Sequence, residues 1–289
     1  MRRLTAEEIR QAACGCEGVV VSDGAVRFLR LPEPLAERYR ADEASRIRLE
    51  CPSGVRLRFR SDTRRIRIGI RYGAAARPLY RGALLVDGSP AGTFGPDEAA
   101  ESWEGTQPVP AADEGALLEL WMPHLVRADL AFLEIDAGSA FEPAPPTGPR
   151  WLALGDSITQ GMTAPLPTET WVARTARQLG LDVRDGGIGG GKLESFVAEA
   201  DLTWPYDVLT VAFGTNDFNV GIPPAEYAAN ARRLAARQTS AHPRARILLI
   251  APTPWVGRVE PNRSGFRLPD YRDALAAVAR ELDRCCFVD

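Results

Sequence analysis

The sequence lacks any long hydrophobic run. No apolar stretch approaches the roughly 20 residues that a membrane-spanning helix needs. The opening residues, MRRLTAEEIRQAACG, also lack the continuous apolar core of a signal peptide. We therefore predict a cytoplasmic protein without a membrane partner.

Cysteine is also scarce, and neither sign of charge predominates. The five cysteines are an odd number without a secretory signal, so we expect reduced thiols rather than a disulfide framework. Neither Cys14 with Cys16 nor Cys285 with Cys286 has the spacing or partner histidines of a zinc site, and no metal or cofactor is expected. A net charge of -3 argues against a nucleic-acid partner.

The N-terminal half has the rhythm of β-strands. Apolar and polar residues alternate from about Gly18 to Phe141, as in VRLRFR (55–60) and RIRIGIRY (65–72). Period two is typical of strands with one buried face. An all-β sandwich or jelly roll over residues 1–142 is the prediction.

Arginines recur at every second position of these strands. The alternation places them on outward faces, where they either bind an acidic polymer or form the solvated side of amphipathic strands, and we expect the second. They are Arg56, Arg58, Arg60, Arg65, Arg67 and Arg71.

A proline-rich stretch separates this half from the next. Residues 143–149 hold four prolines, each of which removes a backbone donor. We predict a linker there.

From Arg150 onward, short buried strands alternate with helical segments. Five strands with four intervening helices predict an α/β domain at residues 150–289, with a parallel sheet and helices on both faces. Right-handed crossovers bring every strand's C-terminal end to one edge, where active sites collect.

Three of those strand ends carry unusual residues. They are Gly155-Asp156-Ser157, the glycines at 189–191, and Gly214-Thr215-Asn216-Asp217. Singly they are explained as a helix cap, a tight turn and an Asx turn. Together they match acyl transfer, which needs a nucleophile and donors aimed at one developing oxyanion.

The blocks GDSITQG, DGGIGGGK and FGTND resemble those of the SGNH, or GDSL-type, hydrolases. The resemblance implies a three-layer αβα, flavodoxin-like domain that follows the β-sandwich. It also implies Ser157 as nucleophile, with the Ser157 and Gly190 N–H groups and the Asn216 side chain as the oxyanion hole. Gly190 is favoured over Gly189, and Asp185 stands where the family usually has asparagine.

The proton acceptor is harder to find. His242 precedes the fourth strand and should lie at the opposite edge of the sheet, while His124 can reach Ser157 only by domain docking. In the family, the acid and base come from an Asp-x-x-His-Pro block after the last strand. Because CCFVD is that strand, we expect both to lie beyond Asp289, in either a shortened copy of a hydrolase or a chain that has lost catalysis.

The leading hypothesis is a serine ester hydrolase that acts through an acyl-enzyme on small acyl esters. Two-domain relatives suggest an acetylated carbohydrate as the small-molecule partner. Four aromatic residues are candidates for stacking on a sugar or for core packing, namely Trp171, Trp204, Trp255 and Phe218. The alternatives are a noncatalytic carbohydrate-binding protein and a thioesterase or lysophospholipase.

Overall fold

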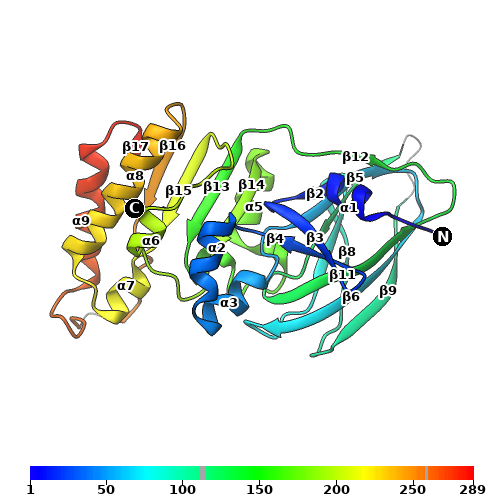
Figure 1. Ribbon diagram of the computed structural model, residues 1–289, viewed down its shortest axis with the longest axis horizontal. Coiled ribbons are helices and arrows are strands. Elements are labelled where there is room, and N and C mark those ends of the chain that lie inside the picture. Colours follow the sequence, from blue (N-terminus) through cyan, green and yellow to red (C-terminus); the bar gives the residue numbers. More distant parts are fainter. Residues whose placement is uncertain (111–114, 258–259) are drawn as a thin grey trace.

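The computed structural model describes residues 1–110, 115–257 and 260–289, and three β-sheets organise them. Two antiparallel sheets, A and B, are built by the N-terminal half, and a parallel sheet, C, by the C-terminal half. Figure 1 shows sheet C with its helices at one end of the molecule and the antiparallel sheets at the other.

The antiparallel strands follow the expected alternation. Sheet A has the order β3-β4-β11-β6-β9 with β1 beside β11. Its strands are β1 (Arg2–Arg3), β3 (Gly18–Ser22), β4 (Ala25–Leu29), β6 (Arg65–Ala75), β9 (Ser102–Pro108) and β11 (Val126–Ile135). Sheet B has the order β12-β5-β10-β7-β8 with β2 beside β5. Its strands are β2 (Ala13–Cys14), β5 (Arg56–Ser61), β7 (Gly82–Val86), β8 (Ser89–Phe94), β10 (Ala116–Trp121) and β12 (Glu142–Pro143).

Sheets A and B share one hydrophobic core. Ile66, Ile68 and Ile70 of sheet A are fully buried in the same cluster as Leu57 and Phe59 of sheet B. Since side chains alternate across a strand, each of these sheets buries one face in this core.

Sheet C brings the three motif-bearing strands side by side. Its order is β14-β13-β15-β16-β17, with all pairs parallel. Gly155 at the end of β13 lies opposite Gly187 of β14 and Ala212 of β15. The strands are β13 (Arg150–Gly155), β14 (Asp182–Gly187), β15 (Val208–Ala212), β16 (Arg246–Ile250) and β17 (Cys285–Val288).

Helices connect and cover the sheets. None in the described ranges is long and apolar enough to cross a membrane. The helices are α1 (Ala6–Ala12), α2 (Glu33–Arg40), α3 (Glu43–Glu50), α4 (Ser157–Gln160), a 3-10 turn (Pro167–Glu169), α5 (Trp171–Leu179), α6 (Ser195–Ala198), α7 (Thr215–Val220), α8 (Pro224–Ala241) and α9 (Leu268–Glu281).

Helix α5 lies between sheets B and C. Its Val172 and Ala176 pack against Trp151 of sheet C. Its Ala173 packs in another cluster with Trp121 of sheet B. One helix therefore joins the two halves of the chain (Figure 1).

The α/β class with a parallel sheet is confirmed, whereas the domain boundaries stay predictions. Two N-terminal helices, α2 and α3, pack with the C-terminal core, where Tyr39 meets Phe196 edge to face at 5.2 Å between ring centres. The sequence analysis does not predict α3. Pro143, the first residue of the expected linker, ends the short edge strand β12.

The solvated-face interpretation is wrong for Arg56. This side chain is only 3% exposed, because the outer face of sheet B is covered by the C-terminal half of the chain. Its neighbours two and four residues on, Arg58 and Arg60, become progressively more exposed. Strand alternation predicts which face a residue occupies but not what packs on that face.

Candidate active site

Ser157 stands at the turn between β13 and α4. Asp156 caps the helix, since its Oδ1 accepts the Ile158 N–H at 2.9 Å. Ser157 is half-buried, and neither its hydroxyl nor its N–H is hydrogen-bonded to any described residue. A hydroxyl and a free backbone donor are thus presented together at a helix N-terminus.

The loop after β14 presents a second free donor. Gly189 donates its N–H to Gln160 Oε1 at 2.7 Å, and Gly191 donates to the Ile188 carbonyl at 2.8 Å. Gly190 is exposed, has a φ of +78° that favours glycine, and finds no acceptor for its N–H in the described ranges. Of the two candidate glycines, Gly190 is therefore the one with an available N–H, although its role as oxyanion donor stays a prediction.

Asn216, the second residue of α7, connects this loop to the serine turn. Its Nδ2 donates to the Gly191 carbonyl at 3.0 Å and, at a longer 3.4 Å, to Asp156 Oδ2. The Asp156 carboxylate thus accepts hydrogen bonds from both the Ile158 N–H in the serine turn and the Asn216 amide. Burial raises the pKa of this carboxyl to about 6.

A buried arginine from the N-terminal half holds the end of β14. Arg30 donates to the carbonyls of Asp185 at 2.8 Å, Gly187 at 3.2 Å and Arg48 at 2.9 Å. Gln160 reaches the same Arg48 carbonyl with its Nε2 at 2.7 Å. The geometry of the glycine loop therefore depends on α3 and on Arg30, the residue that follows β4.

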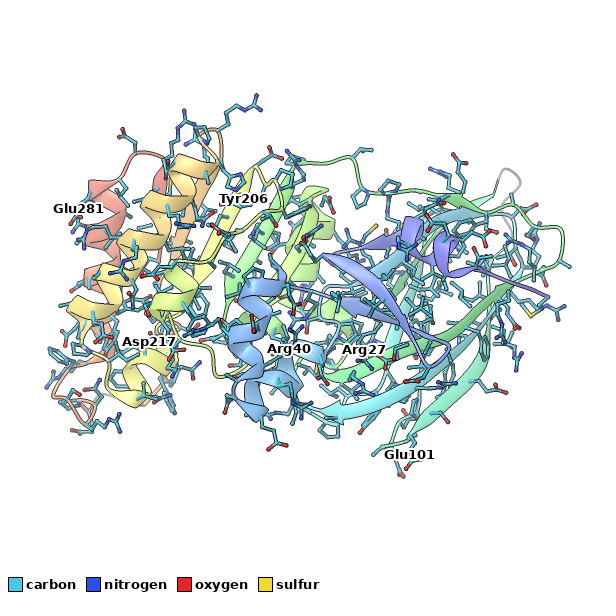
Figure 2. The ribbon with its side chains drawn as sticks, in the orientation of Figure 1. Arg27, Arg40, Glu101, Tyr206, Asp217 and Glu281 are labelled. Carbon is cyan, nitrogen blue, oxygen red and sulfur yellow. The ribbon has the colours of Figure 1, made fainter. Side chains whose placement is uncertain are left out.

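Asp185 and Asp217 are buried carboxyls below the loop. Burial raises the pKa of Asp185 to about 7, opposed by the positive charge of Arg30. Burial, with a smaller contribution from the charge of Asp156, also raises the pKa of Asp217 to about 7. Asp217 Oδ1 accepts the Leu193 N–H at 3.0 Å, and its Oδ2 has no hydrogen-bond partner within the described chain. Figure 2 labels Asp217 at the edge of sheet C opposite Tyr206.

Docking of the two halves brings His124 to α4 but not to Ser157. Its Nε2 donates to the Gly161 carbonyl at 3.1 Å, and burial lowers the pKa of this imidazole to about 4. His242 lies at the opposite edge, as expected, where it contacts the Leu202 carbonyl and the ring of Tyr206. Neither histidine is hydrogen-bonded to Ser157.

An apolar cavity of about 280 Å³ opens beside the serine turn. Trp171, which rests on Trp151, forms part of its wall. The other lining residues are Asp156, Ile158, Ala212, Phe213, Thr215, Ile250, Ala251, Pro252 and Thr253.

The aromatic candidates divide into two groups. Phe218 is buried against Tyr271, and Trp204 precedes β15 at the far edge, where Arg184 lies 4.4 Å from its ring centre. Phe218 is therefore shielded from solvent, and Trp204 lies far from the serine turn. Trp171 lines the cavity, and Trp255, 45% exposed, lies on the loop after β16 at the serine edge.

Sequence reasoning missed the roles of Arg30 and Gln160. Gln160 is visible inside GDSITQG, but no motif or period marks Arg30, whose partners are main-chain carbonyls far along the chain. In the described ranges, no group of three or more His, Cys, Asp or Glu side chains gathers as metal ligands do.

A family model described as the GDSL-like Lipase/Acylhydrolase family matches residues 153–289. These residues, just under half of the chain, are similar to that family. The match covers the serine turn, the glycine loop and α7, and it confirms the expectation of an SGNH or GDSL-type enzyme.

Solved structures extend the likeness of this GDSL-like chain to its N-terminal half. The salicylyl-acyltransferase SsfX3 from a tetracycline biosynthetic pathway is 27% identical, with a TM-score of 0.88 over 100% of this chain and 84% of that one. A family two carbohydrate esterase from Cellvibrio japonicus has a TM-score of 0.64 at 16% identity, over 99% and 87%. Another from Clostridium thermocellum, in complex with cellohexaose, has a TM-score of 0.64 at 17% identity, over 82% of each chain. A search of curated proteins found no match.

Replacing Gln160 by leucine should loosen the glycine loop of this GDSL-like domain. The change leaves the Gly189 N–H without its acceptor, and an unsatisfied buried group costs about 1–3 kcal/mol. Hydrogen exchange should show faster exchange of the Gly189 amide, and urea unfolding should show a lower free energy of unfolding. Gln178→Leu, at an exposed site on α5, is the control, and equal protection of Gly189 in both variants would contradict the expectation.

Asp217→Asn should change how stability depends on pH. The pKa of about 7 lies above the ordinary 3.8, so the folded chain retains a proton that the unfolded chain releases. That contribution is complete below the unfolded pKa and is lost as the pH rises through about 7. Asparagine has no such proton to lose. The free energy of unfolding of Asp217→Asn, measured relative to that of wild type, should therefore increase by at least about 1 kcal/mol between pH 4 and pH 8. Asp283→Asn, at an exposed site, is the control; parallel curves for D217N and wild type would refute the assignment.

Proposed function

We propose that the chain is a serine ester hydrolase that acts through an acyl-enzyme on small acyl esters, with an acetylated carbohydrate as substrate class. The observation that carries the proposal is the pair of unfilled donors, the N–H groups of Ser157 and Gly190, beside a serine hydroxyl. Free N–H groups at a helix N-terminus and a glycine turn favour a negative charge.

The reaction follows from this arrangement. Ser157 Oγ attacks the ester carbonyl carbon, and the carbonyl oxygen becomes an anion bound by the two N–H groups and by Asn216 Nδ2, whose long 3.4 Å hydrogen bond to Asp156 it replaces. Collapse releases the alcohol and leaves an acyl group on Ser157. Water then attacks the acyl carbon and releases the carboxylic acid.

The serine needs a proton acceptor, and neither histidine is hydrogen-bonded to it. That the acid and base lie beyond Asp289 stays a prediction. It is supported by β17, whose parallel direction brings Asp289 to the same edge of sheet C as Ser157. Reading the encoding gene past Asp289 tests it, since an Asp-x-x-His-Pro sequence is expected there and its absence would contradict the prediction.

The small acyl group is supported by the cavity beside Asp156 and Ile158. Its volume of about 280 Å³ lies at the lower limit of ligand pockets. Trp255 offers an exposed ring on the same edge. The carbohydrate esterase neighbours, one of them bound to cellohexaose, motivate the sugar component of the proposal.

A second candidate function is acyl transfer. The 27% identity and full coverage by SsfX3, an acyltransferase, favour it. The first half-reaction is the same, and an acceptor hydroxyl replaces water in the second. Thioester or lysophospholipid hydrolysis would use the same serine chemistry.

We further propose the finer architecture and location. Residues 1–142 form a jelly-roll-like sandwich, residues 143–149 a linker and residues 150–289 a three-layer, flavodoxin-like αβα domain in a cytoplasmic protein. The order β14-β13-β15-β16-β17, which is 2-1-3-4-5 along the chain, supports the flavodoxin-like description.

Asn216→Ala should lower kcat for p-nitrophenyl acetate by roughly 100- to 1000-fold, because one oxyanion donor is lost. Thermal unfolding should remain close to wild type. Asn219→Ala, on the same helix, is the control and should retain activity. In the full product of the encoding gene, wild-type turnover no faster than that of Ser157→Ala would overturn the enzyme proposal and favour a noncatalytic binding protein.

Activity should decline with acyl length along acetyl, butyryl and octanoyl p-nitrophenyl esters, because the cavity is small. The measurement is kcat/KM for each ester. A preference for octanoyl would contradict the small-acyl proposal and favour a lipase-like activity. Acyl transfer to an added alcohol, measured as ester product, separates the acyltransferase from the hydrolase.

A further inference from the structure

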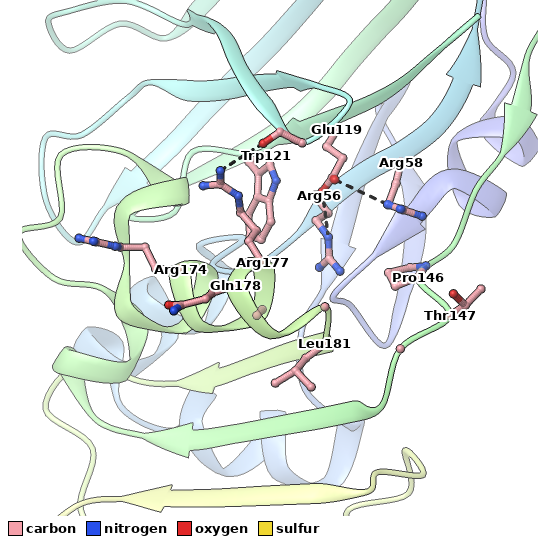
Figure 3. A pocket seen from close by; sticks show the side chains of 14 residues that line it. Arg56, Arg58, Glu119, Trp121, Pro146, Thr147, Arg174, Arg177, Gln178 and Leu181 are labelled. Carbon is pink, nitrogen blue, oxygen red and sulfur yellow. Dashed lines mark hydrogen bonds and ion pairs between the residues drawn. The ribbon is translucent and has the colours of Figure 1, made fainter. Parts of the chain in front are cut away.

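A cavity of about 640 Å³ lies between the outer face of sheet B and helix α5. The linker closes one side of it, and Gly180 and Leu181 at the end of α5 another (Figure 3). Ser157, Gly190 and Asn216 do not line it. The lining residues are Arg56, Arg58, Gly88, Glu119, Trp121, Pro146, Thr147, Gly148, Arg174, Ala176, Arg177, Gln178, Gly180 and Leu181.

Arginines from both sides of the cavity give it a strong positive charge. Arg56 and Arg58 come from β5, and Arg174 and Arg177 come from α5. Glu119 is the carboxylate among the lining residues, so the lining has a net charge of three positive units. Such a concave, one-sign surface concentrates the electrostatic field on anions.

The carboxylates nearby neutralise only the β5 side. Glu119 lies 3.7 Å from the Nε atoms of both Arg56 and Arg58, and Asp182 lies 3.7 Å from Arg56 Nη2. On the α5 side, Arg177 donates to the Gly88 carbonyl at 3.3 Å, and the Arg174 guanidinium has neither a hydrogen bond nor an ion pair with any described residue. Guanidinium donors on α5 are therefore available to a ligand.

Trp121 adds a polar group that lacks a partner. The side chain is 1% exposed, and its indole Nε1–H is one of the buried groups with no acceptor within the described residues. Arg56 lies 4.9 Å from the centre of its ring, which fixes both groups in the wall of the cavity. A buried N–H without an acceptor favours a ligand that supplies an oxygen.

We propose that this cavity binds an anionic small molecule that carries carboxylate or phosphate groups on a body the size of a mono- or disaccharide. The guanidinium groups of Arg174 and Arg177 pair with the anionic oxygens. Arg58, which is bound to Glu119 and the Ala144 carbonyl, adds positive charge from the opposite wall. The volume lies within the range of small-molecule sites. The site is independent of ester hydrolysis and does not rest on the proposed function.

Isothermal titration calorimetry on the full chain tests the proposal with three probes. Digalacturonate presents carboxylates, glucose 6-phosphate presents a phosphate, and cellobiose is the neutral control. At least one anionic probe should bind, more weakly as salt is raised, and cellobiose should not. The probe that binds identifies carboxylate or phosphate as the recognised group. No heat from either anion, or equal binding of cellobiose, would overturn the proposal.

Single substitutions locate the binding site. Arg58→Gln and Arg177→Gln should each weaken binding of the anion about tenfold, because each removes one positive charge from the lining. Arg60→Gln is the matched control, since Arg60 lies on the same face of β5 but outside the cavity. Thermal unfolding checks that each variant folds, and Ser157→Ala should bind the anion as wild type does. Equal affinity in R58Q, R177Q and R60Q would place the anion elsewhere and refute the site.

Discussion

The buried guanidinium of Arg30 is the interaction on which the serine edge depends. It satisfies three main-chain carbonyls at once, two at the end of β14 and one at Arg48 in α3. Removing a charge from water is costly, and here both terminal nitrogens of the guanidinium are paired while its buried Nε has no partner among the described residues. The loop that exposes the Gly190 N–H is consequently shaped by a residue of the N-terminal half. The two halves of the chain form one structural unit at this edge.

Proton occupancy is the second constraint on the same region. Asp156, Asp185 and Asp217 are all buried near the ends of sheet C, and burial raises the pKa of each carboxyl. Arg30 opposes the shift at Asp185, while the charge of Asp156 adds to the shift at Asp217. The serine turn and α7 are therefore coupled electrostatically, because a proton gained by Asp156 removes a charge that raises the pKa of Asp217.

The sequence pattern predicted the strands and their motifs well, because each parallel strand and the motif that follows it are contiguous in the sequence. The strand ends with Ser157, Gly190 and Asn216 meet at one edge because parallel crossovers require it. Tertiary roles were not accessible in the same way. Arg30 looks like any strand-end arginine, and Phe218, two residues after Asn216, packs inward against Tyr271. The segment that covers a strand face, or that supplies a hydrogen-bond acceptor, lies far along the chain and is not marked in the local sequence.

Helix α5 shows how this long-range packing combines functions. Trp171 at its start lines the small apolar cavity beside the serine turn, and Arg177, two turns later, lines the cationic cavity. The same nine-residue helix packs on sheet C through Val172 and on sheet B through Ala173. The position of α5 therefore sets both the wall formed by Trp171 and the wall formed by Arg177. The two cavities thus have one helix in common, although they share no lining residue.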